Sequence, residues 1–198
     1  MYLYGASGHA KVIREILLAQ GQTVAGFIDD NKELNELVGL PVEHSAEGKS
    51  PVIVSIGNNA IRQKVVRQLL CDFGTAVHPS AVVSPSATIG EGTVVMPGAL
   101  INAESQIGKH SIVNTGVSID HECVVGDFVH ISPHATLCGN VHVGDGSWIC
   151  AESTVIQGVT IGRWCTIAAG SVVKRNIPDG AMVAGNPARV LKINAIPE

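Results

Sequence analysis

The sequence predicts a chain in two parts, a small parallel α/β sheet followed by a long triangular coil of parallel β-strands. Three observations predict it. An aliphatic residue recurs every six positions from Val77 to Val173, glycines recur every eighteen positions within that stretch, and the first 75 residues alternate short apolar runs with helical patterns. Neither a helix nor an antiparallel strand has a six-residue period, so the repeat indicates a separate architecture.

The first 75 residues are predicted to form a Rossmann-like parallel sheet. Short apolar runs over residues 2–4, 24–28 and 52–56 predict three strands. Apolar residues at helical spacing follow the first and third runs: Val12, Ile13, Ile16 and Leu17, then Ile61, Val65, Val66, Leu69 and Leu70. The segment between the second and third strands, through Pro41, is expected to be a loop. Strands that alternate with helices in this way are typical of a parallel sheet.

Three loops follow the predicted strands, namely Gly5–His9, Asp29–Asp30 and Gly57–Asn59. Ligands of such sheets bind beyond the carboxyl ends of the strands, and a glycine-rich turn before a helix offers N–H groups to phosphate. The turn is only G-x-x-G, so the full dinucleotide fingerprint is absent. The acidic pair suits a ribose or a sugar, or it caps the next segment, and the asparagines could N-cap the second helix. These loops predict a nucleotide-sugar site, with a purely structural domain as the alternative.

The six-residue repeat predicts a coil over residues 76–178. Seventeen aliphatic residues occur without a break, and every residue two positions before them is small or medium-sized. We expect the aliphatic residue to fill the interior and the smaller one to fit at a corner, so that three hexads make one triangular turn. Glycines then mark one corner of each turn, where we expect a positive φ: Gly90, Gly108, Gly126, Gly144 and Gly162.

A histidine and a carboxylate stand side by side at one predicted corner, in the order Asp120-His121-Glu122-Cys123. Neutral imidazole can accept a proton near pH 7, and a carboxylate can fix its tautomer. Adjacent residues on a strand point apart, so the pairing requires a turn. A solvated surface pair is the alternative, but five of the eight histidines lie between residues 110 and 142, which favours a site.

The segment 179–198 follows the coil and contains Gly185-Asn186-Pro187-Ala188. Beyond Val173 the chain has four basic residues against two acidic ones, although its formal net charge is −4. Such a cluster suits the phosphates of coenzyme A, and a solvated tail is the alternative.

The charge and composition of the chain argue against several classes of partner. The negative charge makes nucleic acid an unsuitable partner, and no apolar run approaches the ~20 residues of a membrane span. The start of the chain lacks the basic region of a signal peptide, so we expect a cytoplasmic protein. The five cysteines form no CxxC pair and are expected to be reduced thiols without a metal, and Cys123 and Cys165 fall at small interior positions.

The order of motifs GASGH, DD, GNN, NT, DHEC and GNPA resembles the hexapeptide-repeat sugar acetyltransferases. It is similar to the bacterial UDP-4-amino-sugar N-acetyltransferases of bacillosamine and perosamine biosynthesis and to the sialic acid O-acetyltransferases. The resemblance implies a left-handed parallel β-helix, a hand that the spacing alone does not give and that the usual crossover preference opposes. It also implies a homotrimer that transfers an acetyl group from acetyl-CoA to the 4-amino group of a UDP-linked amino-dideoxy sugar, for glycan or surface-polysaccharide biosynthesis.

The resemblance assigns roles to individual residues. His121 becomes the general base, which removes the proton as the sugar amine attacks the thioester, and Glu122 becomes its partner. Asn114 and His130 are expected in the same pocket as His121. The other substrate residues are Gly8, His9, Asp29, Asp30, Gly57 and Asn58. The cofactor residues are Gly139, whose N–H would meet the acetyl end, and Ala151, Ala169, Lys174, Gly185, Pro187 and Arg189.

Three other functions remain open on the sequence. A sialic acid O-acetyltransferase would use the same base on a hydroxyl. A metal enzyme of the γ-carbonic-anhydrase type needs converging histidines, yet no two histidines here lie eighteen residues apart. A non-catalytic scaffold would bind a nucleotide-sugar without turnover. The sequence gives no role to His110, His134 or His142.

Overall fold

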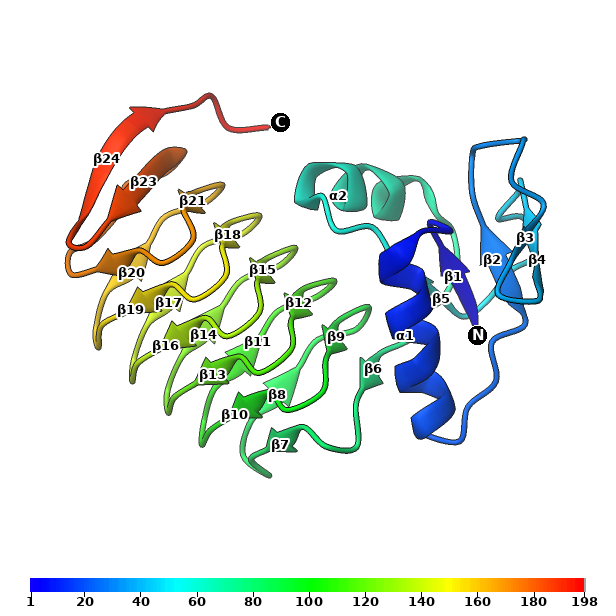
Figure 1. Ribbon diagram of the computed structural model, residues 1–198, viewed down its shortest axis with the longest axis horizontal. Helices are drawn as coiled ribbons and strands as arrows, with labels where there is room; N and C mark the ends of the chain where they lie inside the picture. The colour runs from blue at the N-terminus through cyan, green and yellow to red at the C-terminus, as the bar shows by residue number, and fades with distance from the viewer. Residues whose placement is uncertain (198) are drawn as a thin grey trace.

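The computed structural model describes residues 1–197 and has two parts (Figure 1). The N-terminal part is a five-stranded sheet, here sheet I, in the order β3-β4-β2-β1-β5. Its strands are β1 (Tyr2–Tyr4), β2 (Gly26–Ile28), β3 (Glu36–Leu37), β4 (Leu40–Glu43) and β5 (Val52–Val54). The four strands β4, β2, β1 and β5 run parallel, as the alternating pattern predicts.

The segment through Pro41 is a hairpin, so the expectation of a loop there was wrong. β3 and β4 pair antiparallel around Val38 and Gly39, whose φ angles are 44° and 77°. Two consecutive residues with positive φ make the tight turn that suits a hairpin. The usual signal for such a turn is Asn-Gly or Asp-Gly, and the valine concealed it.

The helices α1 (Gly8–Ala19) and α2 (Asn59–Gln68) follow β1 and β5. The predicted face of α1 is largely confirmed, because Ile13, Ile16 and Leu17 are buried, although Val12 is exposed. The predicted apolar face of α2 was largely wrong, because Val65 is buried but Ile61 and Leu70 are exposed. Its buried residues are Asn59, Arg62 and Val65, and its polar face packs against backbone carbonyls of the second part, which require hydrogen-bond donors.

The second part is a parallel β-helix of seventeen two-residue strands. They are β6 (Ala76–Val77), β7 (Val82–Val83), β8 (Thr88–Ile89), β9 (Val94–Val95), β10 (Leu100–Ile101), β11 (Gln106–Ile107), β12 (Ile112–Val113), β13 (Ser118–Ile119), β14 (Val124–Val125), β15 (His130–Ile131), β16 (Thr136–Leu137), β17 (His142–Val143), β18 (Trp148–Ile149), β19 (Thr154–Val155), β20 (Thr160–Ile161), β21 (Thr166–Ile167) and β22 (Val172–Val173).

Successive strands join three sheets in turn, so each strand pairs with the strand eighteen residues away. Sheet II contains β6, β9, β12, β15, β18 and β21, sheet III contains β7 to β22 in steps of three, and sheet IV contains β8 to β20 in the same steps. We name the corners by the sheets that they join: II–III, III–IV and IV–II.

The interior of the β-helix follows the predicted hexad. Both the aliphatic residue of each hexad and the smaller residue two positions earlier point inward, as with Ile119 and Val117, which are fully buried. Cys123 and Cys165 lie at the smaller positions and are buried in the same core. Four serines at these positions donate to carbonyls of the next turn, as Ser105 Oγ does to Asp120 O at 2.7 Å. Ser171 Oγ accepts the Gly185 N–H instead, so each of these buried hydroxyls has a partner.

The glycines that recur every eighteen residues were predicted to adopt a positive φ, and that reason was wrong. Positive φ falls two residues later at the IV–II corner, for example at Gly92 and His110. The glycines are instead required by close approach of successive turns. A Cβ on Gly108 would lie 2.5 Å from the backbone carbon of Gly126, and a Cβ on Gly144 would lie 2.7 Å from the Arg163 nitrogen.

Gly108→Ala is therefore expected to destabilise the β-helix by about 3 kcal/mol, because the backbone atoms that the methyl group meets cannot rotate away. The matched control is Gly170→Ala, where φ is +68° but no atom lies within 4 Å of the new methyl group. Strain alone at that position costs about 1 kcal/mol. Urea unfolding measures the free energy of unfolding of both variants. If both lose the same amount, close packing between turns is not the reason why residue 108 must be glycine.

The two parts share a continuous apolar core. α1 packs on the outer face of sheet II, where Ala76, Val94 and Ile112 join the residues under sheet I. In Figure 1, α1 lies between sheet I and the first turns of the β-helix, and α2 lies nearer its later turns. The carboxyl edge of sheet I is thereby fixed next to sheet II.

The chain ends in two strands that extend sheet II rather than in a free tail. β23 (Ala181–Gly185) pairs parallel with β21, and β24 (Ala188–Ile193) folds back antiparallel on β23. β24 is therefore the edge strand of sheet II in place of β21, and most of its residues are exposed. Within residues 1–197, no helix is both long and apolar enough to cross a membrane.

Candidate functional site

His121 and Glu122 lie in the turn between β13 and β14, at the III–IV corner. Glu122 has a φ of 59°, which brings its side chain beside the imidazole, and its Oε2 lies 3.0 Å from His121 Nδ1. The turn that this pairing requires is therefore present. A carboxylate at Nδ1 accepts the proton there, so Nε2 is the nitrogen left to accept a proton from a substrate.

Asp120 fixes the backbone of the same turn. Its Oδ1 accepts the His121 N–H at 2.8 Å and the Asn102 amide at 3.2 Å. These two hydrogen bonds, the backbone one first, hold the pKa of Asp120 below its usual value. The turn is thus held both from within and from the turn of the β-helix before it.

Gly139 lies one turn above His121 and supports the imidazole. A Cβ at this position would lie 2.6 Å from His121 Cε1 and 2.7 Å from Nε2, so only glycine allows the ring to lie where it does. Together with Asp120, Gln157 and Gly158, these residues line an open pocket of about 540 Å³. The structure therefore brings His121 and Gly139 together.

The N-terminal candidates gather at the carboxyl edge of sheet I. Both oxygens of Asp29 accept backbone N–H groups, from Ala6 at 2.8 Å and from Asn31 at 2.9 Å, so Asp29 shapes the glycine-rich turn. Asp30 is exposed and accepts the Tyr4 hydroxyl at 2.7 Å. Burial, followed by the effect of Asp30, raises the pKa of Tyr4 to about 12. Of the acidic pair, Asp30 is the residue available to a ligand.

Gly8 and Gly57 face open space, because no atom lies within 4 Å of a Cβ built on either one. The N-cap of α1, Ser7, makes no side-chain hydrogen bond to the helix. The first N–H groups of α1 therefore have no side-chain cap, an arrangement that suits a phosphate. At Asn58 the alternative expectation also holds, since its Oδ1 accepts the Ile61 N–H at 3.0 Å as an N-cap.

Arg62 was not among the predicted site residues, yet it holds the site together. It is 1% exposed, and its guanidinium donates to His110 O at 2.7 Å, Ile56 O at 2.8 Å and Phe128 O at 2.9 Å. The loop after β5 is thereby tied to two IV–II corners. Burial lowers the pKa of Arg62 to about 9, which leaves it charged at neutral pH.

His130 and His9 lie near this buried charge. Burial, followed by Arg62, lowers the pKa of His130 to about 3 and that of His9 to about 4. His130 Nε2 lies 3.1 Å from the Asn114 amide nitrogen, whose oxygen is taken by the Thr115 N–H. Nε2 of His130 must therefore be an acceptor, and its proton resides on Nδ1. Both histidines are therefore neutral near pH 7, and His130 holds the Asn114 amide.

Within one chain, Asn114 and His130 do not share a pocket with His121, so that expectation stays a prediction for neighbouring subunits. His121 lines the pocket at the III–IV corner, whereas His130 lines a different pocket on sheet II. The reason is the hexad itself. Asn114 follows a strand of sheet II and His121 follows the next strand, in sheet III, so their side chains leave different corners.

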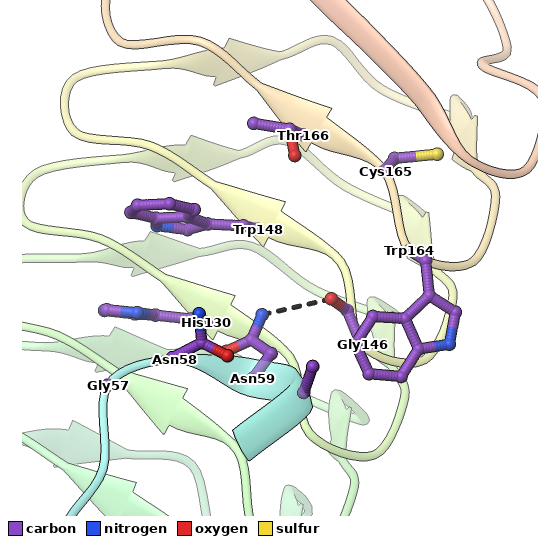
Figure 2. Close-up of a pocket in the computed structure, with 10 residues that line it drawn as sticks. Gly57, Asn58, Asn59, His130, Gly146, Trp148, Trp164, Cys165 and Thr166 are labelled. Atoms are coloured by element: carbon purple, nitrogen blue, oxygen red, sulfur yellow. Dashed lines mark hydrogen bonds between the residues drawn. The ribbon is translucent and has the colours of Figure 1, made fainter. Parts of the chain in front are cut away.

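The sheet II pocket is the one that sequence reasoning missed. It measures about 450 Å³ and lies between the start of α2 and the β-helix (Figure 2), and its lining combines predicted and unpredicted residues: Gly57, Asn58, Asn59, Ala60, His130, Gly146, Trp148, Trp164, Cys165 and Thr166. The signal that could have found it is the position of both tryptophans in a chain with only 4% aromatic residues.

The cofactor candidates fall on two corners. Lys174, Pro187 and Arg189 line one small pocket of about 190 Å³ at the end of the β-helix, and Gly185 lies at the end of β23 beside it. Ala151 and Ala169 lie at the II–III corner, where the Gly170 N–H donates to Ala151 O at 2.9 Å. Because β23 pairs with β21 so that Val183 lies opposite Ile167, Gly185 continues the column of Ala151 and Ala169, and its N–H donates to Ser171 Oγ at 3.2 Å. The GNPA segment therefore joins the two alanines to the basic cluster.

The stability of the protein is expected to fall as the pH drops from about 6.5 toward 4. His9 and His130 have pKa values near 4 and 3 in the fold against 6.5 in the unfolded chain. The unfolded chain therefore binds more protons in this range, and the stability present above pH 6.5 is lost on acidification. At pH 5 the shifted pKa of each histidine lowers the free energy of unfolding by about 2 kcal/mol.

Urea unfolding at pH 7.5 and pH 5 measures this loss. His130→Gln should lose less stability than the wild type on acidification, while His142→Gln, a change at an exposed position on sheet IV, should lose as much. An equal loss in all three proteins would assign the acid sensitivity to other groups.

The remaining polar candidates do not form a metal centre. Within residues 1–197, no group of three or more His, Cys, Asp or Glu side chains is arranged to hold a metal ion. His110 is buried against Phe73 and Phe128, with ring centroids 4.6 Å and 5.2 Å away, which gives it a packing role.

Comparisons with known proteins match both parts of the chain. Residues 1–69 match the model of the PglD N-terminal domain, and residues 140–175 match the bacterial transferase hexapeptide model of six repeats. Perosamine N-acetyltransferase from Caulobacter crescentus, solved as a variant with CoA and GDP-perosamine, is 40% identical, with a TM-score of 0.92 over 96% of both chains. This likeness confirms the predicted α/β part and left-handed β-helix.

Two further relatives agree. The acetyltransferase domain of PglB from Neisseria gonorrhoeae, solved with acetyl coenzyme A, is 39% identical, with a TM-score of 0.89 over 96% of this chain and 98% of that one. The UDP-N-acetylbacillosamine N-acetyltransferase of Bacillus subtilis is 40% identical over 103 residues, which are 46% of this chain. The match spans 48% of that curated relative, about half of its length.

Proposed function

The chain belongs to the hexapeptide-repeat nucleotide-amino-sugar N-acetyltransferases, and we propose that it transfers the acetyl group of acetyl-CoA to the 4-amino group of a UDP-linked amino-dideoxy sugar. The observation that carries the proposal is the His121–Glu122 pair, 3.0 Å apart at the edge of an open pocket. The relatives act on amino sugars, as their names state, which supports an amine acceptor over the hydroxyl of a sialic acid.

The proposed reaction is a direct transfer. The sugar amine attacks the thioester carbonyl, and His121 Nε2 takes the proton as the C–N bond forms. The C–S bond then breaks, and the CoA thiolate leaves and takes up the proton from the imidazolium. Glu122 holds the ring through Nδ1 and stabilises its charged form. No cysteine is required, because the thioester is already activated.

The developing oxyanion needs a hydrogen-bond donor close to the base. The Gly139 N–H is a candidate, since it donates to no group within residues 1–197 and Gly139 lies against the imidazole. Glycine would then serve twice, by leaving room for the ring and by presenting its N–H.

The III–IV corner also suits the rest of the cofactor. His121, Gly139, Gln157 and Lys174 occupy successive turns of this corner. Since neighbouring strands lie about 4.8 Å apart, Lys174 stands about 14 Å beyond His121, a span comparable to the pantetheine arm. Lys174 and Arg189 would then meet the phosphates at the far end.

We infer a homotrimer from the division of the site between two corners. Ala151, Ala169 and Asn114 lie along the II–III corner, with sheet III between them and the III–IV corner. A neighbouring subunit that supplies its III–IV corner would complete the site. Light scattering should give about three times the chain mass of 20.6 kDa, and a monomer that retains full activity would contradict the inference.

The function is tested by thiol release from acetyl-CoA with a panel of acceptors. A UDP-4-amino-4,6-dideoxy sugar should support turnover. GDP-perosamine and sialic acid are included as alternative acceptors. Turnover with the GDP sugar alone would show that the substrate carries GDP in place of UDP. Turnover with sialic acid alone would show that the enzyme is an O-acetyltransferase. If none of the acceptors supports thiol release, the proposal is overturned. We assign the reaction to the cytoplasm, where acetyl-CoA and nucleotide sugars are made, for glycan or surface-polysaccharide biosynthesis.

A further inference from the structure

His121 and its partner Glu122 are not held in place by burial. Their side chains are 56% and 57% exposed, and an exposed ion pair contributes little free energy of its own. The 3.0 Å contact between them therefore depends on the backbone of the corner that carries both residues. The side chains that fix this backbone are the ones that can set the direction of the imidazole.

Asp120, the first residue of this corner, is fixed through its N–H, its carbonyl and its carboxylate. The N–H donates to Leu137 O at 2.9 Å, and the carbonyl accepts the Ser105 hydroxyl at 2.7 Å. The carboxylate accepts the His121 N–H at 2.8 Å and the Asn102 amide at 3.2 Å. It thus connects the backbone of His121 to the turn of the β-helix below.

The serine contact is a general device of the fold. Ser105 Oγ also accepts the Cys123 N–H at 3.3 Å, so one hydroxyl joins both ends of the corner. Ser111 and Ser147 make the same pair of hydrogen bonds at the IV–II corner, where the proposed mechanism places no residue. We therefore assign the Ser105 contact to folding.

The carboxylate contact belongs to one turn of the III–IV corner alone. In the other turns the position of Asp120 is taken by Ser84, Asn102, Cys138, Ile156 and Lys174. Asp120 is therefore the one acidic residue in this column, and it lies in the turn that carries His121. Asn102 stands directly below it, because Ile101 pairs with Ile119. The amide and the carboxylate form a bridge between turns that ends on the His121 N–H.

We propose that Asp120 is a positioning residue for the base, and that Asn102 orients the Asp120 carboxylate. The inference rests on the proposed function, because it takes His121 to be the base. With the His121 N–H held, the imidazole lies between the Glu122 carboxylate and Gly139. Without the carboxylate, that N–H turns to water and the ring is free to leave Glu122. The role is geometric, since Asp120 is only partly buried and solvent screens its charge.

Kinetics with both substrates at saturating concentrations test this role. Asp120→Ala should lower kcat about tenfold and leave both KM values unchanged, since misplacing a reacting group acts on the rate. Asp120→Asn should recover most of the loss, because its amide oxygen still accepts the His121 N–H. Asn102→Ala should lower kcat by about threefold, the effect of one weak hydrogen bond. Equal losses in Asp120→Asn and Asp120→Ala would assign the effect to charge and overturn the geometric role.

Asp127→Ala is the matched control. Asp127 Oδ1 accepts the Lys109 N–H at 2.7 Å, so this change also removes a carboxylate from a corner N–H, but at the IV–II corner. The two aspartate variants should lose similar free energies of unfolding in urea, while only Asp120→Ala loses kcat. Asp120→Ala should add no loss to His121→Ala, because the group that it positions is then absent. A loss of kcat that follows stability in both variants would leave Asp120 with a structural role only.

The imidazole itself gives a measurement that needs no turnover. NMR of the ring nitrogens at about pH 8, where a free imidazole is neutral, shows which nitrogen carries the proton. The His121 signals are the ones absent from His121→Ala. Wild type and Asp120→Asn should show the proton on Nδ1, which faces Glu122, and Asp120→Ala should show a mixture of both forms. The same single form in Asp120→Ala would contradict the positioning role.

The two hypotheses fail separately. Turnover with an unchanged kcat and an unchanged ring proton in Asp120→Ala would leave the function standing and overturn the positioning role. A changed ring proton in Asp120→Ala, in a protein that acetylates none of the acceptors, would leave Asp120 as the residue that positions the imidazole and overturn the function. An unchanged ring proton without acetyl transfer would overturn both.

Discussion

His121→Ala is expected to lower kcat by about 10²–10⁴-fold, the usual contribution of a general base. The imidazole is the group at the pocket edge whose free nitrogen can accept a proton, since Glu122 occupies Nδ1 at 3.0 Å. The KM for the nucleotide sugar should change little, because the candidate sugar residues His130 and Gly57 lie in another pocket. Thiol release measured with both acetyl-CoA and the nucleotide sugar at saturating concentrations gives kcat directly.

Two variants bracket this result. His142→Ala changes an exposed histidine on sheet IV and should retain wild-type activity. Glu122→Gln keeps an oxygen beside Nδ1 but removes the charge, so it should lose less than His121→Ala. Full activity in His121→Ala would remove this histidine from the mechanism, and a loss confined to KM would make it a binding residue.

The β-helix could be predicted because its repeat is visible in the local sequence of each hexad. Each hexad repeats the same choice, an inward aliphatic residue and a smaller one before the corner, so Ile119 and Val117 can be assigned without knowing any distant contact. The reason for a glycine such as Gly108 could not be predicted in the same way. Its requirement comes from the backbone of the next turn, and only the distance between turns reveals that.

The contact between His121 and Glu122 could also be predicted from the local sequence. His121 and Glu122 share one turn, and their contact depends on a single positive φ at Glu122. The relation between Asn114 and His121 could also have been derived from the hexads, because seven residues separate them and each hexad moves the chain to the next face. The resemblance placed them in one pocket, a placement that requires two subunits.

The features that sequence reasoning missed depend on the contact between the two parts. Arg62 looks like an ordinary charged residue on a helix, and its burial follows only from the carbonyls of His110 and Phe128, which lie 48 and 66 residues away. The same docking joins Asn58 to Trp148 in one pocket. Periodicity gives the elements, but it carries no information about how one element meets another.

Gly139→Ala is expected to lower kcat by about 10²-fold while leaving the protein folded. The added methyl group would lie 2.6 Å from His121 Cε1 and 2.7 Å from Nε2, so the ring, which is more than half exposed, must swing away from the pocket. Displacing a base by about 1 Å can cost about a hundredfold in rate. Because the flexible side chain yields rather than the backbone, urea unfolding should change little.

A double-mutant cycle isolates the cause. If Gly139→Ala acts by displacing the imidazole, adding it to His121→Ala should produce no further loss, since the group that it displaces is already gone. If the Gly139 N–H also stabilises the oxyanion, the methyl group leaves that donor in place, and the result is unchanged. Additive losses in kcat would instead show that Gly139 acts on the acetyl group or on the cofactor, independently of His121, and would require a different position for the thioester along the III–IV corner.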